Sequence, residues 1–346
     1  MSARRLYLDR SPGEVRGVVT LDERPERLII HRDEDDPRLR LGARLVGRVA
    51  NVEPALASAF VDLGAGAEAI LSFKPDARPN RGQAIEVEIR GEPRRGKLAV
   101  VRALGPAEGA PRLVAPAPDI AAELLRLSPE AEIVTGRAAR EAADEAEAEA
   151  LETVHALPNG GDLAIEPTRA LVAIDVDLGD RKGADAKRVT RQANLAALGT
   201  AARLLRLKGL GGIVVIDLVG RGHDGQALLA AARIAFGPDN PGVAIGPVGR
   251  FGTMELSLPR RTRPILETLL DGQGAISDRT LAQRLIRRLQ AEGEALRGAR
   301  LVGRCAPAVA DAAANLLPIL AEQLGARFAL KAEAGFARER LEVAAE

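Results

Sequence analysis

Cysteine is nearly absent from this sequence, and that absence limits the structural chemistry available to the chain. Cys305 is the single cysteine among 346 residues. An internal disulfide is therefore impossible, and the paired-cysteine spacing of a structural zinc site is missing. Aromatic residues are also scarce, at 2% of the chain, with no tryptophan.

Long apolar runs and excess charge are missing as well. No apolar run reaches the roughly 18 residues that a membrane-spanning helix needs, and the first residues, MSARRLYLDRSPGEV, lack the apolar segment of a secretory signal. We therefore expect a cytoplasmic protein without a membrane partner. Lysine and arginine number 49 against 48 acidic residues, so the chain lacks the overall basic surface of a strong nucleic-acid binder. Any such contact must come from local patches.

The sequence pattern of the first third of the chain predicts short strands. At 46% hydrophobic residues, the chain can bury a sizeable core, and its length suggests two or three domains. Strand-like runs occupy 15–21 and 27–31, followed by an acidic cluster at 33–36 that we expect in a solvated loop. From 42 to 103, five short alternating strands are broken by Gly, Pro and Asn turns. That pattern predicts a small closed β-barrel of the OB type.

The rest of the chain alternates helices with apolar strands, which predicts a multi-subdomain α/β protein. Helical patterns occupy 119–127 and 137–157, the second mostly solvent-facing. The strands ALVAIDVD and IVVIDLV then alternate with helices at 185–208 and 225–236. Near-continuous Val/Ile strands joined by helices predict βαβ units with a parallel sheet buried on both faces. A last α/β segment covers 276–343.

Asp175 and Asp217 end the two apolar strands. Because a right-handed crossover brings the ends of neighbouring parallel strands to one edge of a sheet, the two carboxylates should converge there. Unpaired they would repel each other, whereas Mg²⁺ typically takes one or two carboxylates plus waters and phosphate. Such an ion can activate water against a phosphodiester. Composition and spacing alone favour a simpler interpretation, in which both aspartates only cap the strand ends or the helices that follow.

Four sequence blocks help to decide between a magnesium site and a capping role for the two aspartates. LPNGGDLAIEPTRALVAIDVD, RQANLAA, LRLKGLGGIVVIDLV and GRFGTMELS occur in this order between Leu157 and Ser257. In order and spacing they resemble the catalytic subdomain of the ribonuclease E/G family. The resemblance implies an OB-type barrel inserted in a ribonuclease-H-like scaffold, followed by a DNase-I-like catalytic subdomain and a small C-terminal α/β unit. The implied boundaries are 1–40 and 107–160 for the scaffold, 41–106 for the barrel, 161–275 for the catalytic subdomain and 276–346 for the C-terminal unit.

The resemblance also assigns roles to individual residues. It implies that Asp175 and Asp217 hold a catalytic magnesium ion. Asp177 stands where the family usually has an asparagine that orients the attacked phosphate, which would place an anion beside that phosphate or recruit a second ion. The family also tends to have a further acid where this chain has Gly220.

An RNA-binding surface is implied for the barrel. GRVANVEPALASAFVDLG is similar to the family's RNA-binding barrel, with Phe60 where a base is stacked and Lys97 where RNA is contacted. Ile70 replaces a second aromatic, and with so few aromatics base stacking cannot be extensive. From the alternating pattern alone, Phe60 could instead be a core residue. Arg250 could grip a phosphate or belong to a solvated basic face.

These features predict an endoribonuclease that uses magnesium to hydrolyse single-stranded RNA, leaving a 5′-phosphate and a 3′-hydroxyl. The alternative is a non-catalytic RNA-binding protein on the same fold, and a weaker one is a scaffold for other RNA-decay proteins. The family's insertion that senses a 5′-monophosphate has no counterpart. Its CPxC zinc link is replaced by ETLLDGQGAIS, so we expect no zinc-linked oligomer, although other contacts could form a homo-oligomer.

Overall fold

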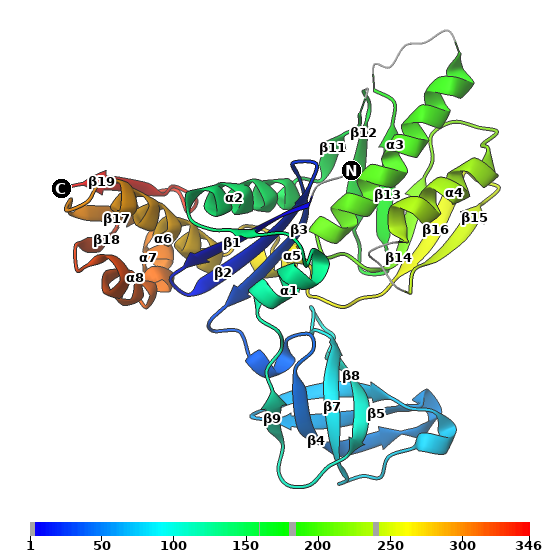
Figure 1. Cartoon of the computed structure of the whole chain (residues 1–346), viewed down its shortest axis with the longest axis horizontal. Coiled ribbons are helices and arrows are strands. Elements are labelled where there is room, and N and C mark those ends of the chain that lie inside the picture. The colour runs from blue at the N-terminus through cyan, green and yellow to red at the C-terminus, as the bar shows by residue number, and fades with distance from the viewer. Residues whose placement is uncertain (1–3, 159, 180–184, 238–241) are drawn as a thin grey trace. The chain divides into compact units, whose positions relative to one another are not determined.

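The computed structural model describes residues 4–158, 160–179, 185–237 and 242–346 and has a mixed α/β fold (Figure 1), which confirms the predicted class. Its contacts divide the chain into two compact units, each made of separate segments. The first unit joins the chain up to Asp36 with Pro118–Glu145 and Ile265–Glu346, and the second joins Pro37–Ala117 with Ala146–Pro264. The predicted names ribonuclease-H-like and DNase-I-like, and the predicted boundaries, remain predictions.

The first unit is built on a four-stranded sheet in the order β10-β1-β2-β3. β10 runs parallel to β1 and the other pairs are antiparallel. Helix α1 (Ile120–Leu127) packs Ile120 and Leu124 onto the apolar side of this sheet. The first strand was missed by the sequence analysis. The strands are β1 (Arg4–Ser11), β2 (Glu14–Leu21), β3 (Arg24–Arg32) and β10 (Ile133–Val134).

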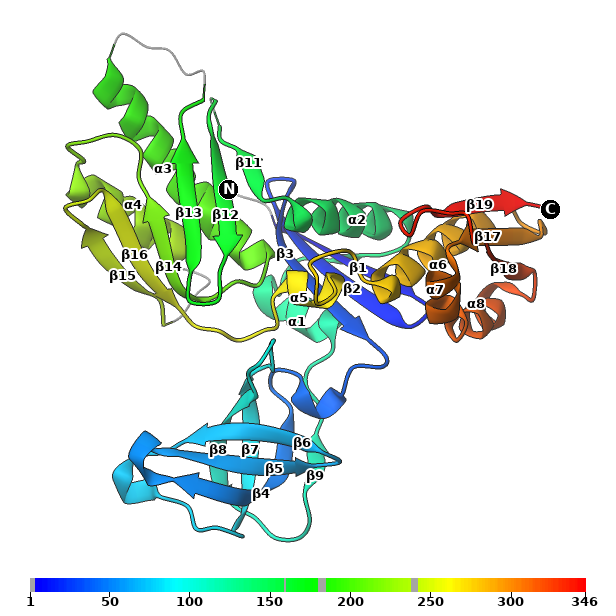
Figure 2. The same ribbon diagram turned by 180° about the vertical axis from the view of Figure 1, so that it is seen from behind.

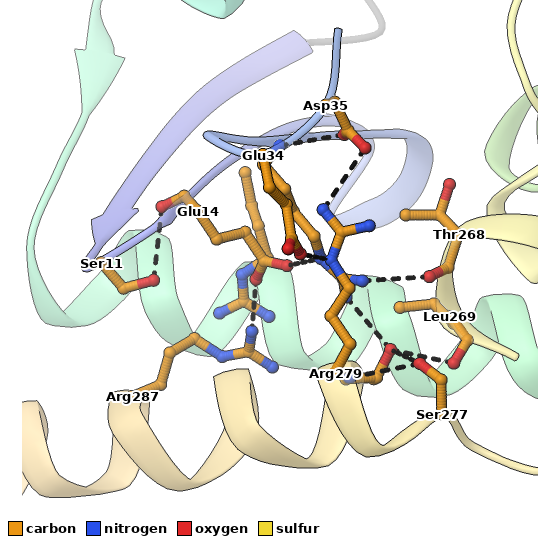
Figure 3. Close-up of polar contacts among 12 residues, drawn as sticks. Ser11, Glu14, Glu34, Asp35, Thr268, Leu269, Ser277, Arg279 and Arg287 are labelled. Carbon is orange, nitrogen blue, oxygen red and sulfur yellow. Dashed lines mark hydrogen bonds and ion pairs between the residues drawn. The ribbon is translucent and has the colours of Figure 1, made fainter. Parts of the chain in front are cut away.

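A buried charge network ties this sheet to helix α6 (Asp278–Ala295) (Figure 3). The Glu14 carboxylate, 1% exposed, accepts from Arg32 Nε at 2.7 Å and from Arg287 Nη1 at 2.5 Å. Arg32 also donates to the Thr280 hydroxyl at 3.0 Å. Asp35, expected in a solvated loop, pairs with Arg279 at 3.3 Å. Burial and the nearby Arg32 lower the pKa of Arg279 to about 10, so the charges here are fixed partners in a low-dielectric setting.

Three helices of the first unit, α6, α7 and α8, pack against a second, smaller sheet in the order β18-β17-β19. Its core contains Leu285, Leu289 and Cys305. Helix α2 (Arg137–Leu151) ends earlier than predicted because residues Val154–Ala156 form strand β11. The prediction that it faces solvent is wrong, since alanines spaced at helical intervals bury one side of it. The elements are α5 (Ile265–Leu269), α7 (Pro307–Ala313), α8 (Leu316–Leu324), β17 (Leu301–Cys305), β18 (Phe328–Ala332) and β19 (Glu342–Ala345), and the buried alanines of α2 are Ala139, Ala143, Ala146 and Ala150.

The second unit contains the predicted barrel. Five strands close on themselves because β4 pairs with both β5 and β7, and β6 pairs in parallel with β8. Ala59, Val61 and Leu63 point into its core. A closed five-stranded barrel consistent with the OB type is therefore confirmed. The strands are β4 (Arg44–Glu53), β5 (Ser58–Gly64), β6 (Ala67–Ser72), β7 (Ala84–Gly91) and β8 (Ala99–Pro106), with β9 (Arg112–Ala115) added beside β4 and short 3₁₀ turns at Pro37–Leu39, Pro54–Leu56 and Pro75–Ala77.

The second unit also contains a six-stranded sheet in the order β11-β12-β13-β14-β16-β15. The prediction of a parallel sheet buried on both faces is wrong. In the described residues β13 and β14 are parallel, while β12 and β16 run antiparallel beside them. Helices α3 (Ala186–Leu207) and α4 (Gly225–Phe236) lie on one face (Figure 2). The strands are β12 (Asp162–Pro167), β13 (Val172–Asp177), β14 (Gly212–Asp217), β15 (Ala244–Val248) and β16 (Thr253–Leu258).

Burial along β13 explains the single covered face. Val172, Ile174 and Val176 are buried, while Asp175 and Asp177 are exposed. Since successive side chains of a strand point to opposite faces, the apolar positions lie under the helices and the aspartates lie on the other, open face. None of the helices in the described part of the chain is long and apolar enough to cross a bilayer.

Candidate active site

Asp175 and Asp217 are direct neighbours on the open face of the six-stranded sheet. They are register partners in the parallel β13–β14 ladder, and adjacent strands lie about 4.8 Å apart. Both are exposed, and among the described residues neither carboxylate has a hydrogen bond or an ion pair. The sequence predicted this convergence at a sheet edge, and the structure places it on the sheet face near the strand ends. Strand topology alone therefore brings together two like charges that no described residue neutralises.

Asp177 occupies the last position of β13 on the same face. Its partner across the antiparallel β12–β13 pair is Asp162, a carboxylate that the sequence analysis did not single out. One Asp177 oxygen accepts the backbone N–H of Gly179 at 2.5 Å. Asp177 is thus engaged in the turn that follows β13.

The strand end that carries Asp217 is fixed by helix α3. The Asn194 side chain, 0% exposed, donates to the carbonyl of Val219 at 3.0 Å and accepts its N–H at 3.1 Å. Gly220 follows at φ +91, where a Cβ would lie 2.9 Å from the Thr190 side chain. A carboxylate at position 220 would require a strained backbone and a clash. Asn194 belongs to the RQANLAA block, yet its positioning role needs the fold to be seen.

The hairpin between β15 and β16 lies next to the same strand end. Asp217 is the register partner of Thr253, and the Leu218 N–H donates to the carbonyl of Gly252 at 3.2 Å. Arg250 sits at the hairpin tip with its guanidinium carbon 4.5 Å from the centroid of the Phe251 ring. Phe251 is 78% exposed. Arg250 was predicted from the sequence and Phe251 was not, because the exposure of an aromatic residue in a turn is not visible in a sequence pattern.

Phe60 lies on the outer surface of the barrel. It is half-buried and stands opposite Ile70, which in turn pairs with Val100 on β8. The three side chains form an apolar row across three strands. The core interpretation of Phe60 is therefore wrong. Lys97 is exposed in the β7–β8 hairpin, three residues before Val100, where it forms an isolated bridge with Arg94.

The carboxylates of β13 and β14 suit a hard divalent cation. Magnesium takes oxygen ligands and commonly keeps several waters beside one or two carboxylates. Asp175 and Asp217 offer two carboxylates that have no partner in the part of the chain that the structure describes. Within the described ranges no group of three or more His, Cys, Asp or Glu side chains is placed to hold a metal ion. The residues present thus fit an ion held by two carboxylates and open to a substrate phosphate, not a closed protein cage.

A closed barrel and a mixed sheet with paired strand-end aspartates define a mixed α/β protein with an exposed pair of carboxylates. Residues 129–261, which include all three aspartates and Arg250, match the Ribonuclease E/G family model. The predicted resemblance to that family is therefore confirmed over this stretch of the chain.

Proteins named ribonuclease E or E/G-like are similar to about a third of the chain. Ribonuclease E of Haemophilus influenzae is 33% identical over 146 residues, covering 39% of this chain and 16% of that protein. Ribonuclease E of Escherichia coli is 36% identical over 107 residues, 30% and 10% respectively. The chloroplastic ribonuclease E/G-like protein of Arabidopsis thaliana is 35% identical over 113 residues, 31% and 11%. The aligned part is thus less than a fifth of each of these proteins.

Proposed function

We propose that this protein is a magnesium-dependent endoribonuclease that hydrolyses phosphodiester bonds in single-stranded RNA. The observation that carries the proposal is the pairing of Asp175 with Asp217 across the parallel β13–β14 ladder, on an exposed face and without partners among the described residues. The match to the ribonuclease E/G family over residues 129–261 supports the same reaction class.

The chain's own residues would divide the work as follows. Asp175 and Asp217 hold the cation, because two adjacent carboxylates repel each other less when they share it. Magnesium, when bound there, would lower the pKa of water and neutralise charge on the phosphodiester. Asp177 lies two residues beyond Asp175 on the same face and would face the phosphate or its attacking water.

Two surfaces would hold the RNA strand. The row of Phe60, Ile70 and Val100 presents one aromatic ring and two aliphatic side chains on the outside of the barrel, and a single stacked base typically contributes about 1–3 kcal/mol. Lys97 and Arg250 are exposed cations suited to phosphate contacts. Because the chain carries a formal charge of only +1, such local cations matter more than its overall field.

The test is cleavage of a labelled, A/U-rich single-stranded RNA with magnesium, with parallel reactions in EDTA. We expect metal-dependent cleavage that Asp175→Asn and Asp217→Asn each reduce by at least about 100-fold, because one ligand of a two-carboxylate site is lost. Glu166→Gln is the matched control. Glu166 is an exposed carboxylate on the same sheet, the register partner of Ala173, and its replacement should leave cleavage nearly unchanged.

RNA binding without cleavage would contradict the enzyme and support the alternative of a non-catalytic RNA-binding protein. Asp177 is the specific observation behind that alternative, since it places a third carboxylate close to the proposed ligands. The three aspartate and glutamate variants should fold alike, which far-UV circular dichroism and thermal unfolding can check. Cleavage that persists in EDTA would remove magnesium from the proposal.

A further inference from the structure

Phe251 is an exposed aromatic in a chain that has very few aromatics. At 78% exposure it is the only aromatic among the exposed large hydrophobic residues of the described chain. Burying such a ring normally stabilises a fold, so a phenylalanine left in water at a hairpin tip gives up that contribution. An exposed ring that folding does not use is available for a ligand.

The hairpin holds the ring in place. The Gly249 N–H donates to the carbonyl of Thr253 at 2.8 Å, and the Gly252 N–H donates to that of Gly249 at 3.0 Å. Gly252 has φ +88, and a Cβ there would lie 3.3 Å from Nε2 of His223. Glycine is thus needed for the turn that places Phe251 at the tip.

The charge of Arg250 and the location of Phe251 near Asp217 both favour a nucleotide as the ligand of the ring. The Arg250 guanidinium carbon lies 4.5 Å from the ring centroid, so a cation that can pair with phosphate accompanies the flat surface on which a base can stack. Thr253, two residues from Phe251, is the register partner of Asp217. Because Phe251 and Gly252 lie in the turn, the two residues span at most about 7 Å, the length they would have in an extended strand. The ring therefore lies within one or two nucleotides of the proposed cleavage site.

We propose that Phe251 stacks on a nucleobase of single-stranded RNA next to the phosphodiester held at Asp175 and Asp217, with Arg250 contacting the adjoining phosphate. The inference rests on the proposed function and adds a substrate-positioning contact to it. The base would be read by its π-face alone, so stacking strength and not base identity would set the preference.

A tryptophan reporter tests the contact directly. The natural chain has no tryptophan, so Phe251→Trp introduces the single indole of the protein at the hairpin tip. In EDTA, where the RNA stays intact, a short single-stranded RNA should quench its fluorescence. Ile234→Trp is the matched control: Ile234 is 76% exposed but lies on α4, away from the open face of the sheet, and its indole should respond little.

Phe251→Ala supplies the energetic readout. Fluorescence anisotropy of labelled RNA should show binding weakened by about 5-fold or more, the usual loss for one stacked base. The same RNA with abasic nucleotides keeps its phosphates and removes its bases, so Phe251→Ala should weaken its binding by less than about 2-fold. Phe251→Tyr should restore binding of the base-containing RNA. In cleavage assays Phe251→Ala should raise KM more than it lowers kcat.

The outcomes separate this inference from the proposed function. If wild-type protein binds and cleaves RNA while Phe251→Ala binds it equally well and Phe251→Trp is not quenched, the stacking contact is overturned and the nuclease stands. An equal loss on intact and abasic RNA also overturns it, because the effect would then not depend on bases. If wild-type protein binds no RNA in any condition, both proposals fall together.

Discussion

Asp177 has a clear structural role and, under the proposed function, would place a negative charge beside the substrate phosphate. One of its oxygens accepts the Gly179 N–H at 2.5 Å and so shapes the turn after β13. Its register partner is another acid, Asp162. An asparagine at position 177 could make the same turn with its amide oxygen, and its amide N–H would meet a phosphate without repulsion. The turn does not explain why the residue is charged.

We therefore predict that Asp177→Asn raises the rate of RNA cleavage. The substitution keeps the acceptor for Gly179 and removes a negative charge close to the proposed phosphate position, so kcat/KM at limiting magnesium should increase by about 3- to 10-fold. Initial rates over a magnesium titration measure it. Asp162→Asn, which removes charge from the neighbouring strand, should give a smaller increase. A loss of cleavage in Asp177→Asn would mean that the charged form is used, as expected if Asp177 helps to bind a second cation.

At the scale of elements, helix α3 fixes the end of β14 through a single buried amide. Asn194 satisfies both backbone groups of Val219, two residues beyond Asp217. Leu198, Ala201 and Leu205 lie on the buried apolar side of the helix, so packing fixes the position of α3. The Asn194 side chain then fixes the end of β14 relative to this helix. A pair of hydrogen bonds to backbone positions a segment that has no regular partner.

Asn194→Leu is expected to destabilise the protein and to disturb the Asp217 site. Two backbone groups of Val219 lose their partners, and each unsatisfied buried group costs about 1–3 kcal/mol. Chemical denaturation measures that loss. Where the variant is still folded, the magnesium concentration for half-maximal cleavage should rise several-fold. Gln192→Ala, at an exposed position of the same helix, is the control and should change neither quantity. A destabilised Asn194→Leu with unchanged magnesium dependence would show that Asn194 supports the fold without positioning Asp217.

The elements differ in how far the sequence predicted them. The barrel strands and the β13–α3–β14 crossover followed from local patterns, because alternation and Val/Ile runs are written in neighbouring residues. The antiparallel direction of β12 and β16 was missed, since strand pairing depends on partners distant in sequence. For the same reason Asp162 escaped notice: nothing near it in the sequence indicates that it faces Asp177. Phe60 was ambiguous because a period of two identifies opposite faces without saying which one is buried.

Over the whole molecule, the chain passes four times between its two compact units. It leaves the first unit after Asp36, returns at Pro118, leaves again after Glu145 and returns at Ile265. Each unit is therefore closed by contacts between segments far apart in sequence, which favours slow, non-local folding.

Within the second unit, Lys208 at the end of α3 makes one such contact between distant segments. It is 1% exposed, and its ammonium donates to the carbonyls of Ala150 at 2.9 Å and Glu152 at 2.5 Å.

Lys208 gives the stability of the protein a defined pH dependence. Burial lowers its pKa from 10.5 to about 8, with nearby Glu149 and Glu152 opposing the shift. Between about pH 8 and 10.5 the unfolded chain therefore binds more protons at this residue than the folded chain, and the contribution of Lys208 to the free energy of unfolding rises with pH. Below pH 8 both states are protonated and this contribution is flat. The rise across the window should be on the order of 2 kcal/mol.

Urea unfolding of wild type and Lys208→Met at pH 7, 8, 9 and 10 isolates this contribution, because other titrating groups are common to both proteins. The wild type should be more stable at every pH, since methionine leaves the Ala150 and Glu152 carbonyls without their donor. Its advantage should stay constant from pH 7 to 8 and grow from pH 8 to 10. Lys187→Met, at an exposed position of α3, should run parallel to wild type throughout. Parallel curves for Lys208→Met as well would mean that the buried ammonium keeps an ordinary pKa, with its two carbonyl hydrogen bonds outweighing the loss of solvent.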